Sequence, residues 1–264
     1  MKRTVCRLTV MLASFVLLLS GCRSADDGGP LPLLVIGSDA YEPYIYRGED
    51  GQFDGIDVEI STEALRRIGY RPVYRQIRWQ DKDSYLQNGR VDCLWGCFSM
   101  DGREERYRWV GPYMVSRQVV VVPANSPIRT LAELNGKCIA VQQSAKPDEL
   151  LLSHAVPQIG TVERVYGLTS LELAFATLRK GYVDACAGHE AACRSCISRA
   201  AGEYRILDEP LLVTNIGVAF AKDNDDAPID ELAAALQQMR EDGTINKILA
   251  GYGLDDGHGG ENAS

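Results

Sequence analysis

The chain has 264 residues, of which 45% are hydrophobic and 24% charged, enough for one large domain or two small ones. Its 36 acidic residues outnumber its 28 basic ones, giving a net charge of −8. Because no cluster of basic residues accompanies this acidic balance, the composition argues against nucleic acid as a partner.

The first residues have the pattern of an export signal. Lys2, Arg3 and Arg7 precede an almost unbroken apolar run over residues 8–19. A bilayer needs ~20 apolar residues, so this run is too short to span one. Its length is instead typical of the central region of a signal peptide.

The apolar run ends in Leu-Ser-Gly-Cys, which matches the bacterial lipobox, with Cys22 as the acceptor of a diacylglyceryl group. We predict a signal peptide over residues 1–21 and an extracytoplasmic lipoprotein held on the cell membrane by acyl chains such as palmitate. The alternative is an ordinary signal peptide that contains a cysteine. Residues 22–32 are typical of a flexible tether, and residues 255–264 are predicted to be a disordered tail. Cleavage would remove three bases and no acid, leaving a net charge of −11.

Between tether and tail, β-branched runs alternate with helical patterns, which is typical of α/β architecture. In the first part we predict strands at 33–36, 72–77 and 91–95 and a helix at 57–68. In the second part we predict strands at 119–122, 138–141, 162–165, 183–187 and 216–221 after an apolar run at 211–213, and helices near Leu131, from Pro147, and at 170–180, 229–239 and 245–249.

The chain is predicted to cross between two units near Ser116 and near Thr214. This predicts lobe 1 over residues 33–115 plus 216–254 and lobe 2 over residues 116–215. Such a topology places a ligand cleft between the lobes and a hinge behind it.

Seven segments, in this order and spacing, resemble a known family. They are Tyr41-Glu42-Pro43-Tyr44, Gly51 to Glu59, Trp79 with Leu86 to Asp92, Arg103 nine residues before Pro112-Tyr113, Gly136-Lys137, Gly181 to Ala185, and Asp242-Gly243-Thr244. Over residues 33–254 the chain resembles the family 3 solute-binding proteins of polar amino acid ABC transporters. The resemblance implies a two-lobed α/β type II periplasmic-binding fold, and a small carboxylate ligand, in the first place an amino acid. It also implies an ABC permease and ATPase on separate chains, and no cofactor.

Arg103 is the first candidate for ligand binding. A guanidinium group is a planar fork that pairs with a carboxylate through two hydrogen bonds. The resemblance implies that Arg103 binds the α-carboxylate of the ligand. The alternative is a surface arginine, in a run with Arg106 and Arg108.

Two aromatic residues occupy positions where the resemblance implies contact with the ligand side chain. Tyr41 and Trp79 would enclose it through stacking or cation–π contact. Asp39 stands where the family often has a residue that contacts the distal end of the ligand, although one residue is missing between it and Tyr41. The alternative for both aromatic residues is packing within a lobe.

Other positions depart from the family pattern. In the stretch Gly96-Cys97-Phe98-Ser99, Phe98 replaces a hydroxyl residue that meets the carboxylate, which leaves backbone groups and Ser99. In the second lobe, Ser144-Ala145-Lys146 stands in place of Gly-Thr-Thr, with two hydroxyl groups lost and a cation gained. We predict that Gly96, Ser144 and Ala145 still contact the ligand.

His189 aligns with the family's ammonium-binding aspartate. A neutral imidazole can accept one hydrogen bond, whereas a protonated one repels an ammonium group. Either Glu190 supplies the negative charge, or the ligand lacks a free α-ammonium. The remaining alternative is that His189 caps the following helix.

Besides Cys6 and Cys22, the cysteines are Cys93, Cys97, Cys138, Cys186, Cys193 and Cys196. An exported protein permits disulfides, so their pairing stays open. Cys93, Cys138 and Cys186 lie in predicted strands and are predicted to be buried core residues. His189, Cys193 and Cys196 share one helix face and could bind zinc, but no fourth ligand is near in sequence, and we predict no metal.

Two other functions use the same fold. One is a ligand-sensing domain without a transport role. The other is a dehydratase-like enzyme, in which His189 and Glu190 would exchange protons with the substrate. Because no motif identifies catalysis, we predict a binding protein that is not an enzyme and has no catalytic residues.

Overall fold

The computed structural model describes residues 29–200, 202–225 and 227–255. The predicted signal peptide, Cys22 and most of the predicted tail lie outside these ranges. The chain from Leu31 onward forms one compact unit. Within the described ranges, no helix has both the length and the apolar character needed to cross a membrane.

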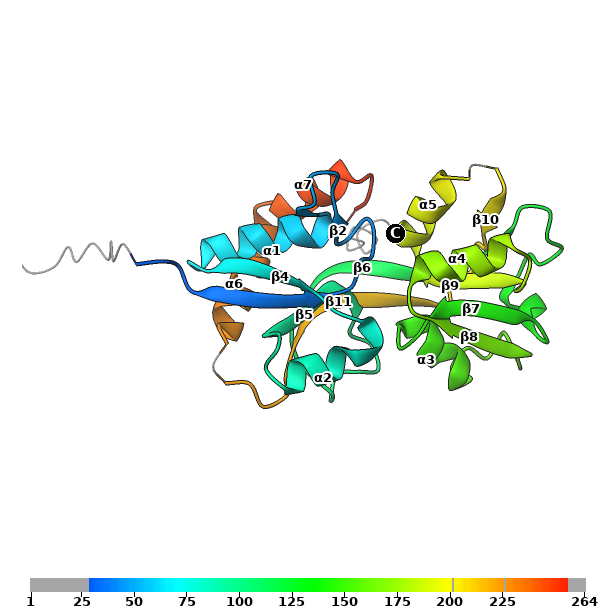
Figure 1. Cartoon of the computed structure of the whole chain (residues 1–264), viewed down its shortest axis with the longest axis horizontal. Coiled ribbons are helices and arrows are strands. Elements are labelled where there is room, and N and C mark those ends of the chain that lie inside the picture. Colours follow the sequence, from blue (N-terminus) through cyan, green and yellow to red (C-terminus); the bar gives the residue numbers. More distant parts are fainter. Residues whose placement is uncertain (1–28, 201, 226, 256–264) are drawn as a thin grey trace, which may run out of the picture. The chain divides into compact units, whose positions relative to one another are not determined.

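A mixed sheet of nine strands forms the centre of this unit (Figure 1). Its order is β4-β1-β5-β11-β6-β9-β7-β8, and β10 also pairs with β6. The strands are β1 (Leu33–Ser38), β4 (Arg71–Gln76), β5 (Cys93–Ser99), β6 (Arg108–Pro123), β7 (Cys138–Gln142), β8 (Arg164–Leu168), β9 (Ala185–His189), β10 (Tyr204–Ile206) and β11 (Leu212–Phe220). A separate hairpin consists of β2 (Tyr46–Arg47) and β3 (Phe53–Asp54).

The strands β6 and β11 are shared by two halves of the sheet. At one end β11 pairs with β5, and at the other end β6 pairs with β9 and β10. Between these ends, Ser116 of β6 lies opposite Thr214 of β11. The predicted two-lobed α/β fold is therefore confirmed. The lobe boundaries stay a prediction, with which this pairing agrees; lobe 1 below holds β1, β4 and β5, and lobe 2 holds β7, β8 and β9.

Helices cover both lobes (Figure 1). They are α1 (Ile56–Arg67), α2 (Lys82–Gln87), α3 (Lys146–Leu152), α4 (Leu171–Arg179), α5 (Glu190–Ser198), α6 (Ile229–Glu241) and α7 (Thr244–Gly251). In α1 the buried residues Ile56, Ile60 and Ala64 recur at helical spacing, so one face packs on the sheet. Ser170 caps α4 by accepting a hydrogen bond from the backbone of Leu173.

Several predicted elements have different bounds in the structure. The element near Leu131 is a single 3₁₀ turn, Leu131–Leu134. The runs at 211–213 and 216–221 form one strand, β11, and β6 begins eleven residues before the predicted strand at 119–122. The hairpin β2–β3 and strand β10 were not predicted, because each is only two or three residues long.

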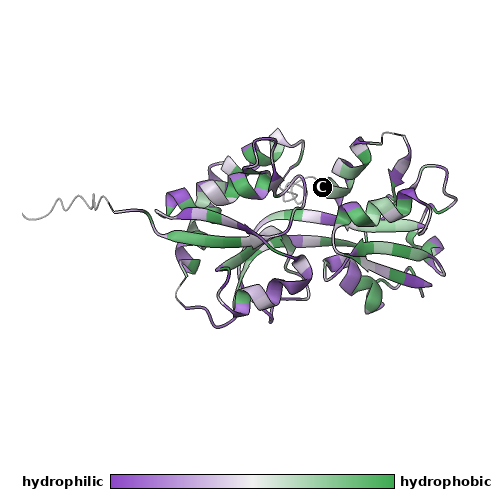
Figure 2. Ribbon diagram, in the orientation of Figure 1, coloured by the Kyte–Doolittle hydropathy of each residue, from purple (hydrophilic) through white to green (hydrophobic). Residues whose placement is uncertain are grey.

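Hydrophobic residues concentrate on the central strands, and hydrophilic residues on the outer faces of the helices (Figure 2). One core cluster of lobe 1 contains Ile77, Trp79, Leu94, Phe98 and Tyr107, packed below α2. Trp79 follows β4 in the 3₁₀ turn Trp79–Asp81, and Phe98 is in β5. This cluster therefore supports the two aromatic side chains that also border the site described next.

Candidate functional site

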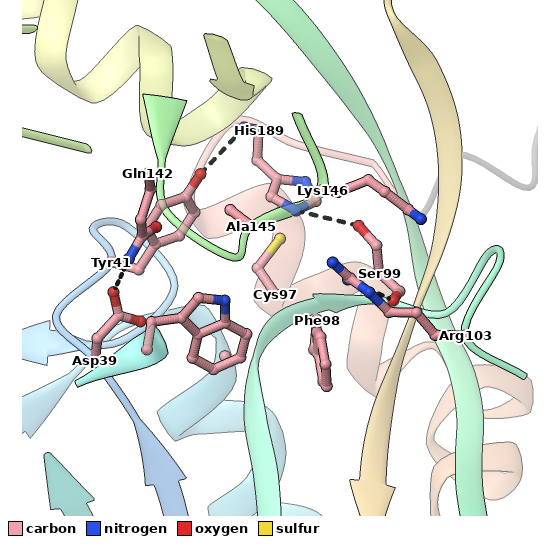
Figure 3. Close-up of a pocket in the computed structure, with 12 residues that line it drawn as sticks. Asp39, Tyr41, Cys97, Phe98, Ser99, Arg103, Gln142, Ala145, Lys146 and His189 are labelled. Carbon is pink, nitrogen blue, oxygen red and sulfur yellow. Dashed lines mark hydrogen bonds between the residues drawn. The ribbon is translucent and has the colours of Figure 1, made fainter. Parts of the chain in front are cut away.

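Residues of both lobes line a pocket of about 300 Å³ (Figure 3). Its lining residues are Asp39, Tyr41, Trp79, Gly96, Cys97, Phe98, Ser99 and Arg103 from lobe 1, and Gln142, Ala145, Lys146 and His189 from lobe 2. Most follow or end a strand: β1 precedes Asp39, β5 ends at Ser99, β7 at Gln142 and β9 at His189. The ends of these strands thus meet at one small polar cavity, as in ligand sites of other α/β proteins.

All predicted ligand-binding residues except Ser144 and Glu190 line this pocket. The backbone N–H of Ser144 donates to Asp148, and its carbonyl oxygen accepts from Lys82 Nζ at 3.3 Å. The Glu190 carboxylate lies outside the pocket, 3.1 Å from Arg117 and 2.6 Å from Arg194. The structure therefore does not bring Glu190 to the place where a ligand ammonium would need it.

Sequence reasoning did not single out Cys97, Gln142 or Lys82. Gln142 ends β7, and the end of a parallel strand is a frequent place for a ligand-binding side chain, which is a signal that the sequence does contain. Lys82 begins α2 directly after the turn that holds Trp79. Its position follows from the approach of the two lobes, which no local pattern reveals.

Arg103 is the most deeply buried cation of the pocket, with 3% of its surface exposed. Its Nη1 donates to the Ser99 carbonyl at 3.2 Å, and its Nε and Nη2 lie 3.0 and 2.9 Å from Glu149 Oε2. Its guanidinium carbon is 5.0 Å from the centre of the Phe98 ring. Burial lowers the pKa of Arg103, but a guanidinium group stays charged in proteins.

Lys82 and Lys146 add two further buried ammonium groups. Burial lowers the pKa of Lys82 to about 8 and lowers the pKa of Lys146. Lys146 Nζ lies 3.2 Å from Glu149 Oε1. Burial would raise the pKa of Glu149, but Arg103 and Lys146 together hold it below its usual value. Glu149 is therefore an ionised carboxylate shared by two cations, one from each lobe.

Asp39 and Tyr41 join the lobes at the opposite end of the pocket (Figure 3). The Asp39 carboxylate accepts a short hydrogen bond from the Gln142 amide. Burial in the cleft raises the pKa of Asp39 to about 7, although the bond from Gln142 acts in the other direction. The Tyr41 hydroxyl accepts a hydrogen bond from the backbone N–H of His189 at 3.1 Å.

His189 is held by neutral side chains only. Its Nδ1 lies 2.8 Å from Ser116 Oγ, and its Nε2 lies 2.7 Å from Gln118 Nε2 and 3.4 Å from Ser99 Oγ. Burial, and then the charge of Arg103, lower the pKa of His189 to about 3, so the imidazole is neutral at physiological pH. If the Gln118 amide donates to Nε2, then Nδ1 carries the proton and donates to Ser116.

Two alternatives for the residues around His189 are wrong. His189 occupies the N-cap position of α5, but its side chain makes no capping hydrogen bond and lines the pocket instead. Within the described ranges, no group of three His, Cys, Asp or Glu side chains has the geometry to hold a metal ion, which rules out the zinc site with Cys193 and Cys196 there.

The six described cysteines are all free thiols. Cys93 and Cys186 are buried as predicted, and Cys97 and Cys193 are buried as well. Cys138, which we predicted to be in the core, is only partly buried because β7 begins with it at the end of the sheet. The thiols therefore act as small apolar residues, and burial raises their pKa.

Two α/β lobes that share two strands and enclose a pocket with a buried arginine define a solute-binding protein. The chain belongs to the bacterial extracellular solute-binding proteins, family 3, whose model matches residues 33–255. This confirms the family indicated by the seven sequence segments.

Individual relatives are similar over most of the chain. The L-cystine-binding protein TcyA of Bacillus subtilis is 26% identical, covering 82% of this chain and 79% of its own. The L-cystine-binding protein TcyJ of Escherichia coli K12 is 25% identical, covering 82% and 80%. The solved structure of Tv2483 bound to L-arginine has a TM-score of 0.77 and 28% identity, covering 85% of this chain and 92% of its own.

Proposed function

We propose that this protein captures a small carboxylate, an amino acid or a closely related acid, and delivers it to an ABC permease and ATPase on separate chains. The observation that carries this proposal is the buried guanidinium of Arg103 in a pocket between two lobes. A guanidinium group has five N–H donors. Among the described residues, Glu149 and Ser99 take three of them. One N–H on each terminal nitrogen is left for the two oxygens of a ligand carboxylate.

The aromatic side chains of the pocket support a ligand with an apolar part. Tyr41, Trp79 and Phe98 border the pocket, and the Trp79 and Phe98 rings meet edge to face at 5.0 Å. Because these rings are already held by packing, little side-chain entropy is lost when a ligand contacts them. The solutes named for the relatives, L-cystine and L-arginine, are of the size that this proposal requires.

The proposal includes an anchor on the outer side of the membrane. Its support is the lipobox that ends at Cys22, after a run too short to cross a bilayer. Acyl chains on Cys22 would keep the protein near its permease. An enzymatic role for His189 and Glu190 lacks such support, because the Glu190 carboxylate is paired with Arg117 and Arg194 outside the pocket.

The proposal is tested by ligand binding to the purified full-length chain. We expect a thermal-shift screen of common amino acids and their deaminated analogues to find stabilising carboxylates. A ligand at 100 times its dissociation constant adds about 2.7 kcal/mol to the free energy of unfolding. Arg103→Met should weaken the carboxylates that bind by about ten-fold or more, because a hydrogen bond to a charged group contributes ~1.5–3 kcal/mol.

Arg106→Met is the matched control, because Arg106 is three residues away but exposed and paired with Asp83. Its affinity should equal that of the wild type. If Arg103→Met folds and binds carboxylates as tightly as the wild type, Arg103 does not bind the ligand and the proposal fails.

A further inference from the structure

The charges that border the pocket are unbalanced. Lys82, Arg103 and Lys146 are cations with 3%, 3% and 5% of their surface exposed. Only two carboxylates lie among them, Asp39 and Glu149. A buried charge is costly unless it is paired, so an excess of buried cations favours a ligand that brings more than one negative charge.

Lys82 is the cation without a carboxylate partner. Among the described residues it takes part in no ion pair, and its one hydrogen bond goes to the Ser144 carbonyl at 3.3 Å. Its Nζ lies 5.3 Å from the centre of the Trp79 ring and 6.0 Å from that of Phe98, and both rings line the pocket. An ammonium group has three N–H donors, so two remain for a ligand at this wall.

The other end of a zwitterionic amino acid finds no free anion. His189 is neutral and bonded to Ser116 and Gln118. The Asp39 carboxylate is bonded to Gln142, and the Glu149 carboxylate to Arg103 and Lys146. An α-ammonium group would lose its hydration in this pocket and gain no unshared carboxylate in return, which costs free energy.

We propose that the pocket selects a small dianionic carboxylate without an α-ammonium group, with Arg103 binding one anionic group and Lys82 the other. This rests on the proposed function and narrows its ligand class. Arg103 and Lys82 lie 5.0 and 6.0 Å from the centre of the same ring, that of Phe98. A diacid with a few carbon atoms between its carboxylates spans such a pair, and its apolar middle contacts the aromatic wall.

Calorimetric titration of the full-length chain at neutral pH tests this inference. The probes are glutarate, its amino derivative glutamate and its monoacid counterpart pentanoate, with succinate, aspartate and butyrate as a shorter set. We expect the diacid of a set to bind more tightly than the amino diacid and the monoacid. Lys82→Met should weaken diacid binding by about ten-fold or more and leave monoacid binding within about two-fold.

The ratio of diacid to monoacid affinity separates binding from a structural role. If Lys82 only ties the lobes together through Ser144, Lys82→Met weakens both ligands equally and the ratio is unchanged, which overturns the inference. Lys82→Arg should keep the preference because it keeps the charge. Lys222→Met, on an exposed surface beside Glu105, should change nothing.

The two proposals fail differently. Tighter binding of glutamate or aspartate than of glutarate or succinate overturns the dianion inference and leaves carboxylate capture standing. If no carboxylate binds and Arg103→Met has no effect on any ligand, the proposed function fails as well.

Discussion

His189 shows how one residue changes the chemistry of a conserved-looking pocket without changing its shape. Its imidazole is enclosed by Ser116, Gln118 and Ser99, all neutral, and its backbone is tied to Tyr41. An ionised acid in this place would face Arg103 and the other cations and cancel part of their charge. A neutral imidazole leaves that positive charge available to a ligand.

The neutral state of His189 makes stability depend on pH. Its pKa is about 3 in the folded protein and 6.5 in the unfolded chain. Between pH 6.5 and 3 only the unfolded chain binds the proton, so the wild type loses stability as the pH falls through this window, by about 1.4 kcal/mol per pH unit. His189→Gln should not show this loss.

The measurement is urea unfolding of both proteins from pH 7.5 to 4. Asp57, whose pKa burial raises to about 7, acts in the opposite direction, since its folded form keeps a proton that the unfolded chain releases above pH 3.8. Both proteins contain Asp57, so the difference between their curves isolates His189. Parallel curves would show that His189 titrates normally.

The predictability of the site also divides by residue. Arg103, Tyr41 and Trp79 could be predicted because their spacing to neighbouring motifs is independent of the second lobe. Glu190 was predicted on the assumption that a small register change would turn it inward. The structure ends β9 at His189 and begins α5 at Glu190, so the first helical turn directs Glu190 towards Arg194 instead.

Among the elements, β11 is the most constrained because it pairs with strands on both sides. Its register shifts at Gly217, where it passes from Val110 of β6 to Phe98 of β5. A Cβ atom at Gly217 would lie 2.7 Å from Met100 Sδ and 2.9 Å from the Val110 carbonyl oxygen. The bulge therefore requires glycine for lack of space.

Gly217→Ala should lower the free energy of unfolding by about 1–3 kcal/mol, because backbone must move to admit the methyl group. Chemical denaturation measures this directly. Gly251→Ala, in α7 with no atom within 4 Å of its Cβ position, is the matched control and should be neutral or slightly stabilising. Equal stability of the two variants would contradict this account of β11.

The first half of β6 could not be predicted from sequence for a related reason. It contains Gly111-Pro112, which predicts a turn, and the polar residues Ser116 and Gln118. Both are buried only because His189 of lobe 2 bonds to them. Periodicity within one segment does not contain the partner that makes a polar residue suitable for a core.

At the scale of the whole molecule, polar contacts join the lobes around the pocket. They are Asp39 with Gln142, Tyr41 with His189, Glu42 with Ser195 and Arg199, Lys82 with Ser144, and Arg103 with Glu149. The last of these places a protein carboxylate on the guanidinium proposed to bind the ligand. Glu149 therefore competes with a ligand carboxylate for Arg103.

Glu149→Gln should raise the affinity for carboxylates by up to about five-fold, since a partly exposed ion pair contributes ~0.2–1 kcal/mol. Titration calorimetry with the carboxylates found in the screen measures the change. Glu105→Gln removes the same charge from the surface of lobe 1, where Glu105 pairs with Lys222, and should leave the affinity unchanged. Weaker binding by Glu149→Gln would mean that Glu149 assists the ligand.

The central position of β11 also bears on how the protein is made. Its neighbours β5 and β6 end at residues 99 and 123, but β11 spans residues 212–220. A chain that emerges from its N-terminus therefore presents two unpaired strand edges through the synthesis of about 90 further residues. Exposed edges of this kind invite pairing with other chains. The last strand to emerge thus completes both lobes at once, so neither lobe can finish its sheet before nearly the whole polypeptide has appeared.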